Sequence, residues 1–153
     1  MQNLSLTELQ PLILEWAKER NILFPENAPK QRLKLIEESG ELASAILKND
    51  VNLQKDAIGD IFVVLVILSE QTSVNIYLDL TRNTVILDES IDYNLGSICF
   101  KNPSKPESLE TEIYILHDLS RLLNLDLTEC ANIAWNEIKD RKGKTVNGTF
   151  IKD

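Results

Sequence analysis

The sequence is poor in the residues that cross-link, break or turn a chain. Its 153 residues include five glycines, five prolines, two cysteines and one histidine. So few glycines and prolines argue against a turn-rich β-sandwich and favour helices. Cys99 and Cys130 lie far apart, outside any C-x-x-C pattern, so we expect reduced core thiols in a cytoplasmic protein. The lone His117 argues against a histidine-rich metal site.

Positive charge and long apolar runs are also scarce. The formal net charge is −8 at pH 7, which argues against binding of nucleic-acid polymers, since their partners usually carry a basic surface. The opening MQNLSLTELQ lacks the basic and apolar regions of a secretory signal. The longest apolar run, Ala57 to Leu68, is interrupted by Gly59 and Asp60 and is too short to span a membrane. We therefore expect one cytoplasmic domain over residues 1–153 with no membrane partner.

The apolar periodicity predicts an all-α fold, a helical bundle. The expected helices span residues 7–20, 30–48, 53–71, 89–101, 107–123 and 128–141. Thr7 and Gln10 have the spacing of a capping box for the first helix, and we expect Thr128 to cap the last.

Three segments are less regular in pattern. The Ile- and Val-rich half of 53–71 would also suit a buried strand, but its length favours a helix. Residues 73–88 suit either a small hairpin or a loop with short helical turns. Residues 142–153 are basic and contain glycine, which predicts an irregular tail.

Two clusters of carboxylates stand out on consecutive predicted helices. Glu37, Glu38 and Glu41 are three or four residues apart, so all three can share one side of a helix. Asp56 and Asp60 are four apart and share a side in the same way. The short connection NDVN would make the two helices antiparallel and bring the clusters face to face.

Carboxylates so placed repel one another, and their removal from water increases the cost. A hard divalent cation would relieve the repulsion, and Mg²⁺ prefers carboxylate oxygens and commonly bridges them to substrate phosphates. An acidic protein can in this way bind a phosphorylated substrate. The alternative for the glutamates is an ordinary solvated helix face. Asp60 favours the metal interpretation, because it lies inside the most apolar helix, between Gly59 and Ile61.

These residues resemble a known family. EESGE followed by DAIGD is similar to the all-α nucleoside triphosphate pyrophosphohydrolases, the MazG-like group, whose signature is E-x-x-E, a spacer, then E-x-x-D. Glu38 and Glu41 match the first half, and Asp60 matches the final aspartate. The third position departs from the signature, since it is Ala57. Asp56, one residue earlier on the same helical side, is the candidate to replace the missing glutamate.

The C-terminal stretch CANIAWNEIKDRKGKTVNGTFIKD and the segment EWAKERNI also resemble this family. The resemblance implies substrate-binding roles for Asn136, Lys139, Arg141 and Lys142. The basic residues among these would otherwise stabilise the carboxyl end of a helix. Lys34, one turn before Glu38, would approach a phosphate or pair with that glutamate. Trp16 and Trp135 could stack on a base, although core packing is the simpler interpretation.

The resemblance implies cleavage of a nucleoside triphosphate between the α- and β-phosphates. Mg²⁺, or alternatively Mn²⁺, would be held by Glu38, Glu41, Asp56 and Asp60, with Glu37 or Glu38 as the catalytic base. A homodimer or homotetramer is expected, as is usual in the family. Two other classes remain open at this point. The chain could be an inactive helical regulator that binds a nucleotide or a protein, as the departure at Ala57 suggests, or a purely structural oligomer.

Overall fold

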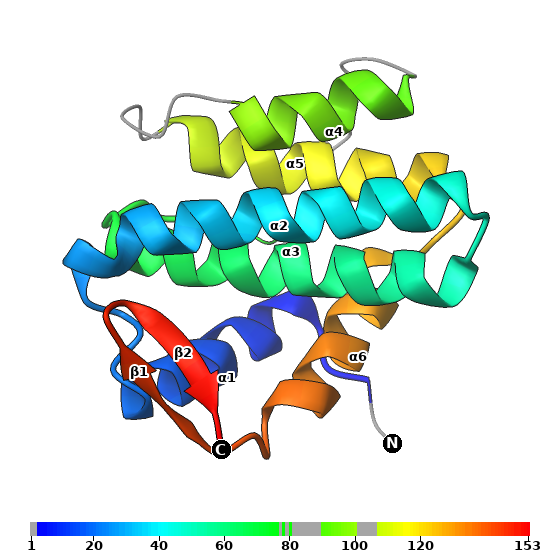
Figure 1. Cartoon of the computed structure of the whole chain (residues 1–153). Coiled ribbons are helices and arrows are strands. Elements are labelled where there is room, and N and C mark those ends of the chain that lie inside the picture. The colour runs from blue at the N-terminus through cyan, green and yellow to red at the C-terminus, as the bar shows by residue number, and fades with distance from the viewer. Residues whose placement is uncertain (1–2, 77, 79, 81–89, 101–106) are drawn as a thin grey trace.

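The fold is a bundle of helices packed around one long central helix (Figure 1). The computed structural model describes residues 3–76, 78, 80, 90–100 and 107–153. The described elements, in chain order, are α1 (Leu6–Glu19), the short 3-10 helix η1 (Pro25–Asn27), α2 (Ala28–Leu47), α3 (Val51–Gln71), α4 (Ile91–Phe100), α5 (Glu107–Leu122), α6 (Leu127–Ile138), β1 (Gly143–Val146) and β2 (Thr149–Lys152). The predicted all-α class is therefore confirmed, with a two-stranded sheet added at the C-terminal end.

Helix α3 forms the centre of the core, and every residue from Ile61 to Ser69 is buried. It packs against α1, α2, α5 and α6, so it is covered on all sides. A helix enclosed in this way is apolar all round rather than on one stripe, which explains why its sequence also suited a buried strand. In Figure 1, α2 lies alongside α3, with α4 and α5 on one side and α1, α6 and the hairpin on the other.

Two of the predicted helix caps are displaced by two residues. Helix α1 begins with a capping box between Ser5 and Glu8, in which the Ser5 amide donates to Glu8 Oε2 at 2.8 Å. Thr7 and Gln10 were therefore the wrong pair. Helix α6 is capped by Asp126, whose carboxylate accepts from the Glu129 amide at 2.7 Å, instead of by Thr128. In both cases the side chain that reaches the free amides lies just before the first helical residue.

The prediction of an irregular tail over residues 142–153 is wrong. Strands β1 and β2 pair antiparallel, with Thr145 opposite Phe150. Asn147 and Gly148 join them with φ angles of 50° and 77°. A two-residue hairpin turn of this kind requires positive φ at both central positions, for which Asn-Gly is the preferred pair. The Asn147-Gly148 dipeptide is thus a sequence signal for a hairpin. It was missed because the strands on either side are short and carry charged residues.

Residues 73–88 fall largely outside the described part of the chain. Val74, Ile76 and Leu78 are described, have no regular secondary structure, and the last two are buried. Cys99 and Cys130 are both free thiols, as expected. Among the described residues, no helix combines the length and apolar character needed to cross a bilayer.

Candidate active site

The carboxylates of α2 and α3 lie on facing helices. A tight turn after Leu47, with Asn49 at φ 53°, reverses the chain, and Asp50 caps α3 by accepting from two amides at 3.1 Å. The two helices then run antiparallel and pack along their length (Figure 1). Glu38 of α2 consequently acts on Asp56 and Asp60 of α3 through its charge. The predicted pairing of the two clusters is present in the structure.

The three glutamates of α2 have different environments. Glu38 is only 4% exposed, whereas the side chain of Glu37 is 57% exposed. Lys34 Nζ lies 2.8 Å from Glu38 Oε1 and 2.9 Å from Glu37 Oε2, so it pairs with both. Glu41 is exposed and faces the same cleft. Of this set, Glu38 is the carboxylate that the fold removes from water.

The environment of Glu38 is electrostatically unfavourable for a negative charge. Burial raises its pKa above the ordinary value, and the nearby charges of Glu41 and Glu37 add to this, although Lys34 opposes it. Its second oxygen, Oε2, is buried without a hydrogen-bond partner in the described structure. Burial alone would lower the pKa of Lys34, but its bonds to Glu38 and Glu37 raise it. Lys34 therefore stays charged beside this carboxylate.

Asp60 has the most strongly perturbed carboxylate of α3. Burial, followed by the charges of Glu38, Asp56 and Glu137, raises its pKa to about 7, while Arg141 opposes the shift. The pKa of Asp56 is also raised, by burial and then by a contact with Glu137. Asp56 faces the cluster, whereas its neighbour Ala57 is 3% exposed within the core. A metal-ligand role for Asp56 in place of the family glutamate stays a prediction.

Glu137 is a sixth carboxylate beside the cluster, and the sequence did not reveal it. It lies in the last turn of α6, forms a side-chain hydrogen bond with Asp56, and is paired with Arg141 four residues later. The charge of Glu137 is one of the causes that raise the pKa of Asp56. The i, i+4 spacing of Glu137 and Arg141 indicated an ion pair, but not that this pair faces α3.

The close approach of α6 depends on Gly59. A Cβ atom at this position would lie 2.3 Å from the Cys130 carbonyl oxygen and 2.9 Å from the Ala134 Cβ. Only glycine lets the two helices approach this closely. Because Gly59 directly precedes Asp60, the contact places the end of α6 beside the carboxylate cluster.

A cleft of about 570 Å³ opens beside the cluster. Its volume lies within the range typical of small-molecule sites. The charged residues that line it are Lys30, Lys34, Glu37, Glu38, Glu41, Asp60, Arg141 and Lys152. Apolar and aromatic side chains, and the hairpin, form the rest of the wall. The cleft thus combines acidic, basic and apolar surfaces within one space.

The predicted substrate-binding residues divide into two groups. Lys34 and Arg141 line the cleft. Asn136, Lys139 and Lys142 are exposed on the surface outside its lining, and Lys139 Nζ donates to Asn136 Oδ1 at 2.9 Å. Trp16 is buried and lines the cleft, whereas Trp135 packs at the edge of the core. Substrate roles for the three surface residues stay a prediction.

The donor chemistry of the cluster suits a hard divalent cation. All its candidate ligands are carboxylate oxygens, and Glu38 Oε2 is buried with no hydrogen-bond partner among the described residues. In the part of the chain that the structure describes, no three His, Cys, Asp or Glu side chains are arranged closely enough to ligate one ion. Lys34 instead supplies the positive charge next to Glu38.

Comparison with known proteins adds independent information. Residues 29–86 match the model of the MazG nucleotide pyrophosphohydrolase domain. The chain is also 43% identical over 77 residues to an uncharacterized 18.2 kDa protein in the rep-hol intergenic region of Haemophilus phage HP1 (strain HP1c1). That match covers 48% of this chain and 47% of the phage protein, about half of the relative's length. No solved structure matches the chain.

The matched segment includes both halves of the carboxylate motif, from Glu38 on α2 to Asp60 on α3. Over residues 29–86 the chain is therefore similar to the MazG nucleotide pyrophosphohydrolase domain, the same family that the carboxylate motif resembles.

Proposed function

We propose that the protein is a Mg²⁺-dependent nucleoside triphosphate pyrophosphohydrolase, which releases a nucleoside monophosphate and pyrophosphate. The observation that carries this proposal is the partly buried carboxylate cluster at a cleft that also presents Lys34 and Arg141. A nucleoside triphosphate needs positive charge around its phosphates, and an acidic cluster accepts it only with a cation. The family match supports the same class of reaction.

In this proposal the side chains of Glu41, Asp56 and Asp60 close around the cation, Glu38 is left to act as the base, and Mn²⁺ can replace Mg²⁺. When bound, the cation neutralises phosphate charge and lowers the pKa of water in the site. The raised pKa values of Asp56 and Asp60 record how poorly the protein alone stabilises their charges. Glu137, in contact with Asp56, orients that carboxylate.

The residues around the cluster have separate tasks. Glu38 accepts the proton of the attacking water at Oε2, because this oxygen has no hydrogen-bond partner in the described part of the chain, while Lys34 binds Oε1. The water oxygen forms a new bond to the α-phosphorus. At the same time the bond between the α-phosphorus and the oxygen that bridges the α- and β-phosphates breaks. The leaving pyrophosphate takes the electron pair of that bond, and Arg141 at the cleft rim stabilises its charge.

The decisive experiment measures pyrophosphate release from a panel of canonical and modified nucleoside triphosphates with Mg²⁺ or Mn²⁺. We expect turnover of at least one substrate, and a loss of about 10²-fold or more in Glu38→Gln. Glu15→Gln is the matched control, since Glu15 is an exposed glutamate on α1 outside the cleft. No turnover with any substrate would contradict the proposal. Thermal stabilisation by nucleotide without turnover would favour a nucleotide-binding regulator instead.

We also propose that the protein forms a homodimer or homotetramer. Large apolar side chains are exposed along α2 and at its junction with α3, namely Leu33, Ile36, Leu47, Val51 and Leu53. Burial of such a surface against a second copy would remove it from water. Light scattering after gel filtration tests this proposal, and a monomer at micromolar concentration would contradict it.

A further inference from the structure

The C-terminal hairpin forms a wall of the cleft that differs in chemistry from the carboxylate cluster. Gly148, Thr149, Phe150 and Lys152 line the cleft from the hairpin. Across from them lie apolar side chains of α3, namely Val63, Val64 and Ile67, with Ile22 and Trp16 beside them. This apolar part of the cleft, which we call the aromatic end, has no carboxylate of its own among these residues.

Phe150 is placed there by the pairing of the two strands. Its ring centroid lies 5.5 Å from that of Trp16, at an angle of 63°. A Cβ at Gly143, which is paired with Lys152 on the neighbouring strand, would lie 2.6 Å from a ring carbon of Phe150, so the glycine leaves room for the ring. Successive side chains of a strand point to opposite faces, and Ile151 accordingly points away and is exposed. The hairpin thus presents one aromatic ring on its inner face.

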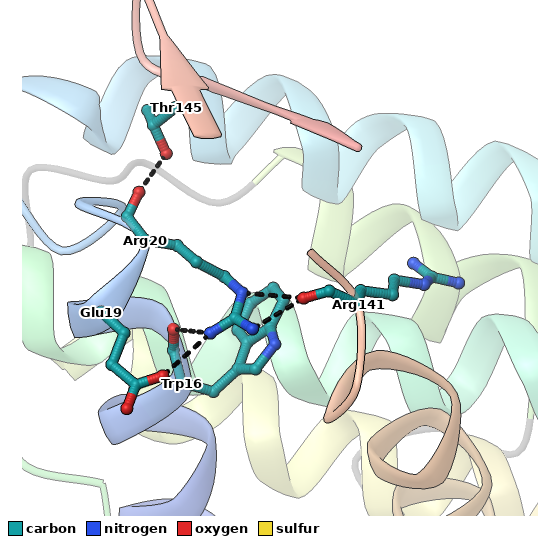
Figure 2. A network of polar contacts seen from close by, with 5 residues as sticks. All are labelled: Trp16, Glu19, Arg20, Arg141 and Thr145. Atoms are coloured by element: carbon teal, nitrogen blue, oxygen red, sulfur yellow. Dashed lines mark hydrogen bonds and ion pairs between the residues drawn. The ribbon is translucent and has the colours of Figure 1, made fainter. Parts of the chain in front are cut away.

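A network centred on Arg20 holds this wall in place (Figure 2). The Arg20 guanidinium donates to the Arg141 carbonyl at 2.6 and 3.1 Å and to the Trp16 carbonyl at 3.0 Å. It also lies over the Trp16 ring, 4.7 Å from the centroid. The Arg20 carbonyl in turn accepts from Thr145 Oγ1 at 2.6 Å. One residue therefore fixes both the junction after α6 and the first strand.

The turn of the hairpin is fixed by a different contact. A Cβ at Gly148 would lie 2.8 Å from the side-chain oxygen of Asn27 and 3.2 Å from a carbon of Lys30. The turn therefore packs tightly against the start of α2. Together with the Arg20 network, this contact makes the hairpin a fixed wall of the cleft.

Apart from Thr149 and Lys152, the side chains of the aromatic end are aliphatic or aromatic, and these give a phosphate no hydrogen bonds. The aromatic end suits a flat, partly apolar group with hydrogen-bond acceptors. Trp16 Nε1 is a buried donor with no acceptor among the described residues, which is an unfavourable state for a polar group. A ligand that supplies aromatic surface and acceptor atoms would complete this end of the cleft.

The aromatic end lies at a useful distance from the carboxylates. Val63 and Ile67 follow Asp60 on α3 by three and seven residues. At a rise of 1.5 Å per residue, these positions are about 5–10 Å further along the helix. A molecule with phosphates at Lys34 and Arg141 would extend its sugar and base in this direction.

We propose that the inner face of the hairpin, with Phe150 at its centre, is the subsite for the nucleoside part of the substrate. This inference rests on the proposed function, because it assigns the other half of the same cleft. The base packs against Phe150 and the apolar side chains of α3, while the phosphates face Lys34 and the carboxylates.

The test measures binding of nucleoside monophosphates by tryptophan fluorescence. The chain has two tryptophans, so Trp135→Phe leaves Trp16 as the only tryptophan whose emission is followed. We expect a saturable change in Trp16 emission with at least one nucleoside monophosphate and none with inorganic pyrophosphate. In this background Phe150→Ala should weaken binding about ten-fold, the lower part of the range for loss of base stacking. Ile151→Ala, on the outer face of the same strand, should bind as the parent does.

A second variant distinguishes the loss of the Phe150 ring from unfolding of the hairpin. Phe150→Leu keeps apolar packing on Trp16 but lacks the ring, and it should also bind about ten-fold more weakly. Parent-like binding by Phe150→Leu, or an equal loss in Ile151→Ala, would overturn the inference. If nucleotide binding depends on Phe150 but the protein turns over no substrate, the proposed nucleoside subsite is supported and the proposed hydrolase activity is refuted. Turnover with unchanged KM in Phe150→Leu would refute the subsite alone.

Discussion

Asp60→Asn should stabilise the metal-free protein at pH 8. The pKa of Asp60 is raised to about 7, with burial as the largest cause and the charges of Glu38, Asp56 and Glu137 next. In the unfolded chain an aspartate titrates near pH 3.9. Between these values the folded state retains a proton that the unfolded state has released. The contribution of Asp60 to the free energy of unfolding therefore falls as the pH rises from about 4 to 7, and this contribution is constant above pH 7.

The size of the effect follows from the same numbers. The difference between a pKa of about 7 and the ordinary value corresponds to about 4 kcal/mol. Asp60 is partly exposed and its neighbours share the titration, so solvent screening reduces this to about 1–2 kcal/mol for Asp60→Asn. For a chain of this size that gain raises Tm by about 2–8 °C.

The assay is thermal unfolding followed by circular dichroism at pH 5, 6, 7 and 8, with EDTA present. The advantage of Asp60→Asn should be small at pH 5 and largest at pH 8. Glu70→Gln is the control, because Glu70 is an exposed carboxylate on the same helix. A variant less stable than the parent at pH 8, or an advantage independent of pH, would refute the electrostatic argument. The same substitution should abolish turnover, since Asp60 is a proposed ligand of the cation.

Four further variants test the packing around the site. Gly59→Ala places a methyl carbon 2.3 Å from a carbonyl oxygen of α6, so urea unfolding should show a loss of about 1–3 kcal/mol. Gly40→Ala, with no atom within 4 Å, should instead gain about 0.5–1 kcal/mol, and a loss there would contradict the packing argument. Ala57→Glu restores the family glutamate but buries a carboxylate in the core, so it should lower stability by about 2 kcal/mol or more without raising kcat. Higher activity in that variant would show that Asp56 is no substitute. Arg20→Met should speed amide hydrogen exchange of the hairpin about ten-fold, because the clamp on the Arg141 carbonyl is lost, and unchanged protection would count against that clamp.

Much of the fold follows from local patterns. Helical periodicity placed α1 to α6 within a few residues of their observed bounds, and it put the glutamates and aspartates on α2 and α3. These features depend on spacing along one helix, which the sequence shows directly. The caps were displaced because several polar residues near each helix start could serve, and only the observed geometry of the first turn chooses among them.

The candidate site likewise has some features that the sequence shows and others that only the fold determines. The sequence placed Glu37 and Glu38 together but gave no reason to distinguish them, whereas the fold buries Glu38 and leaves Glu37 in water. It offered Lys34 two partners, a phosphate or Glu38, and in the structure Lys34 pairs with both Glu38 and Glu37. Burial is a property of what covers a side chain, so no pattern within α2 determines it.

By itself, the sequence determined the helical class, the order of the helices and the five carboxylates that α2 and α3 contribute to the cluster. The tertiary structure decided that Glu137 joins them and that the hairpin closes the cleft. Both depend on contacts between residues far apart in the chain. The absence of a side chain at Gly59 lets α6 approach α3 at Cys130 and Ala134. The carbonyl of Arg20 accepts a hydrogen bond from Thr145, on a strand that begins more than a hundred residues later. Such contacts leave no periodic trace in the sequence, because each is made once, between surfaces that only the folded chain brings together.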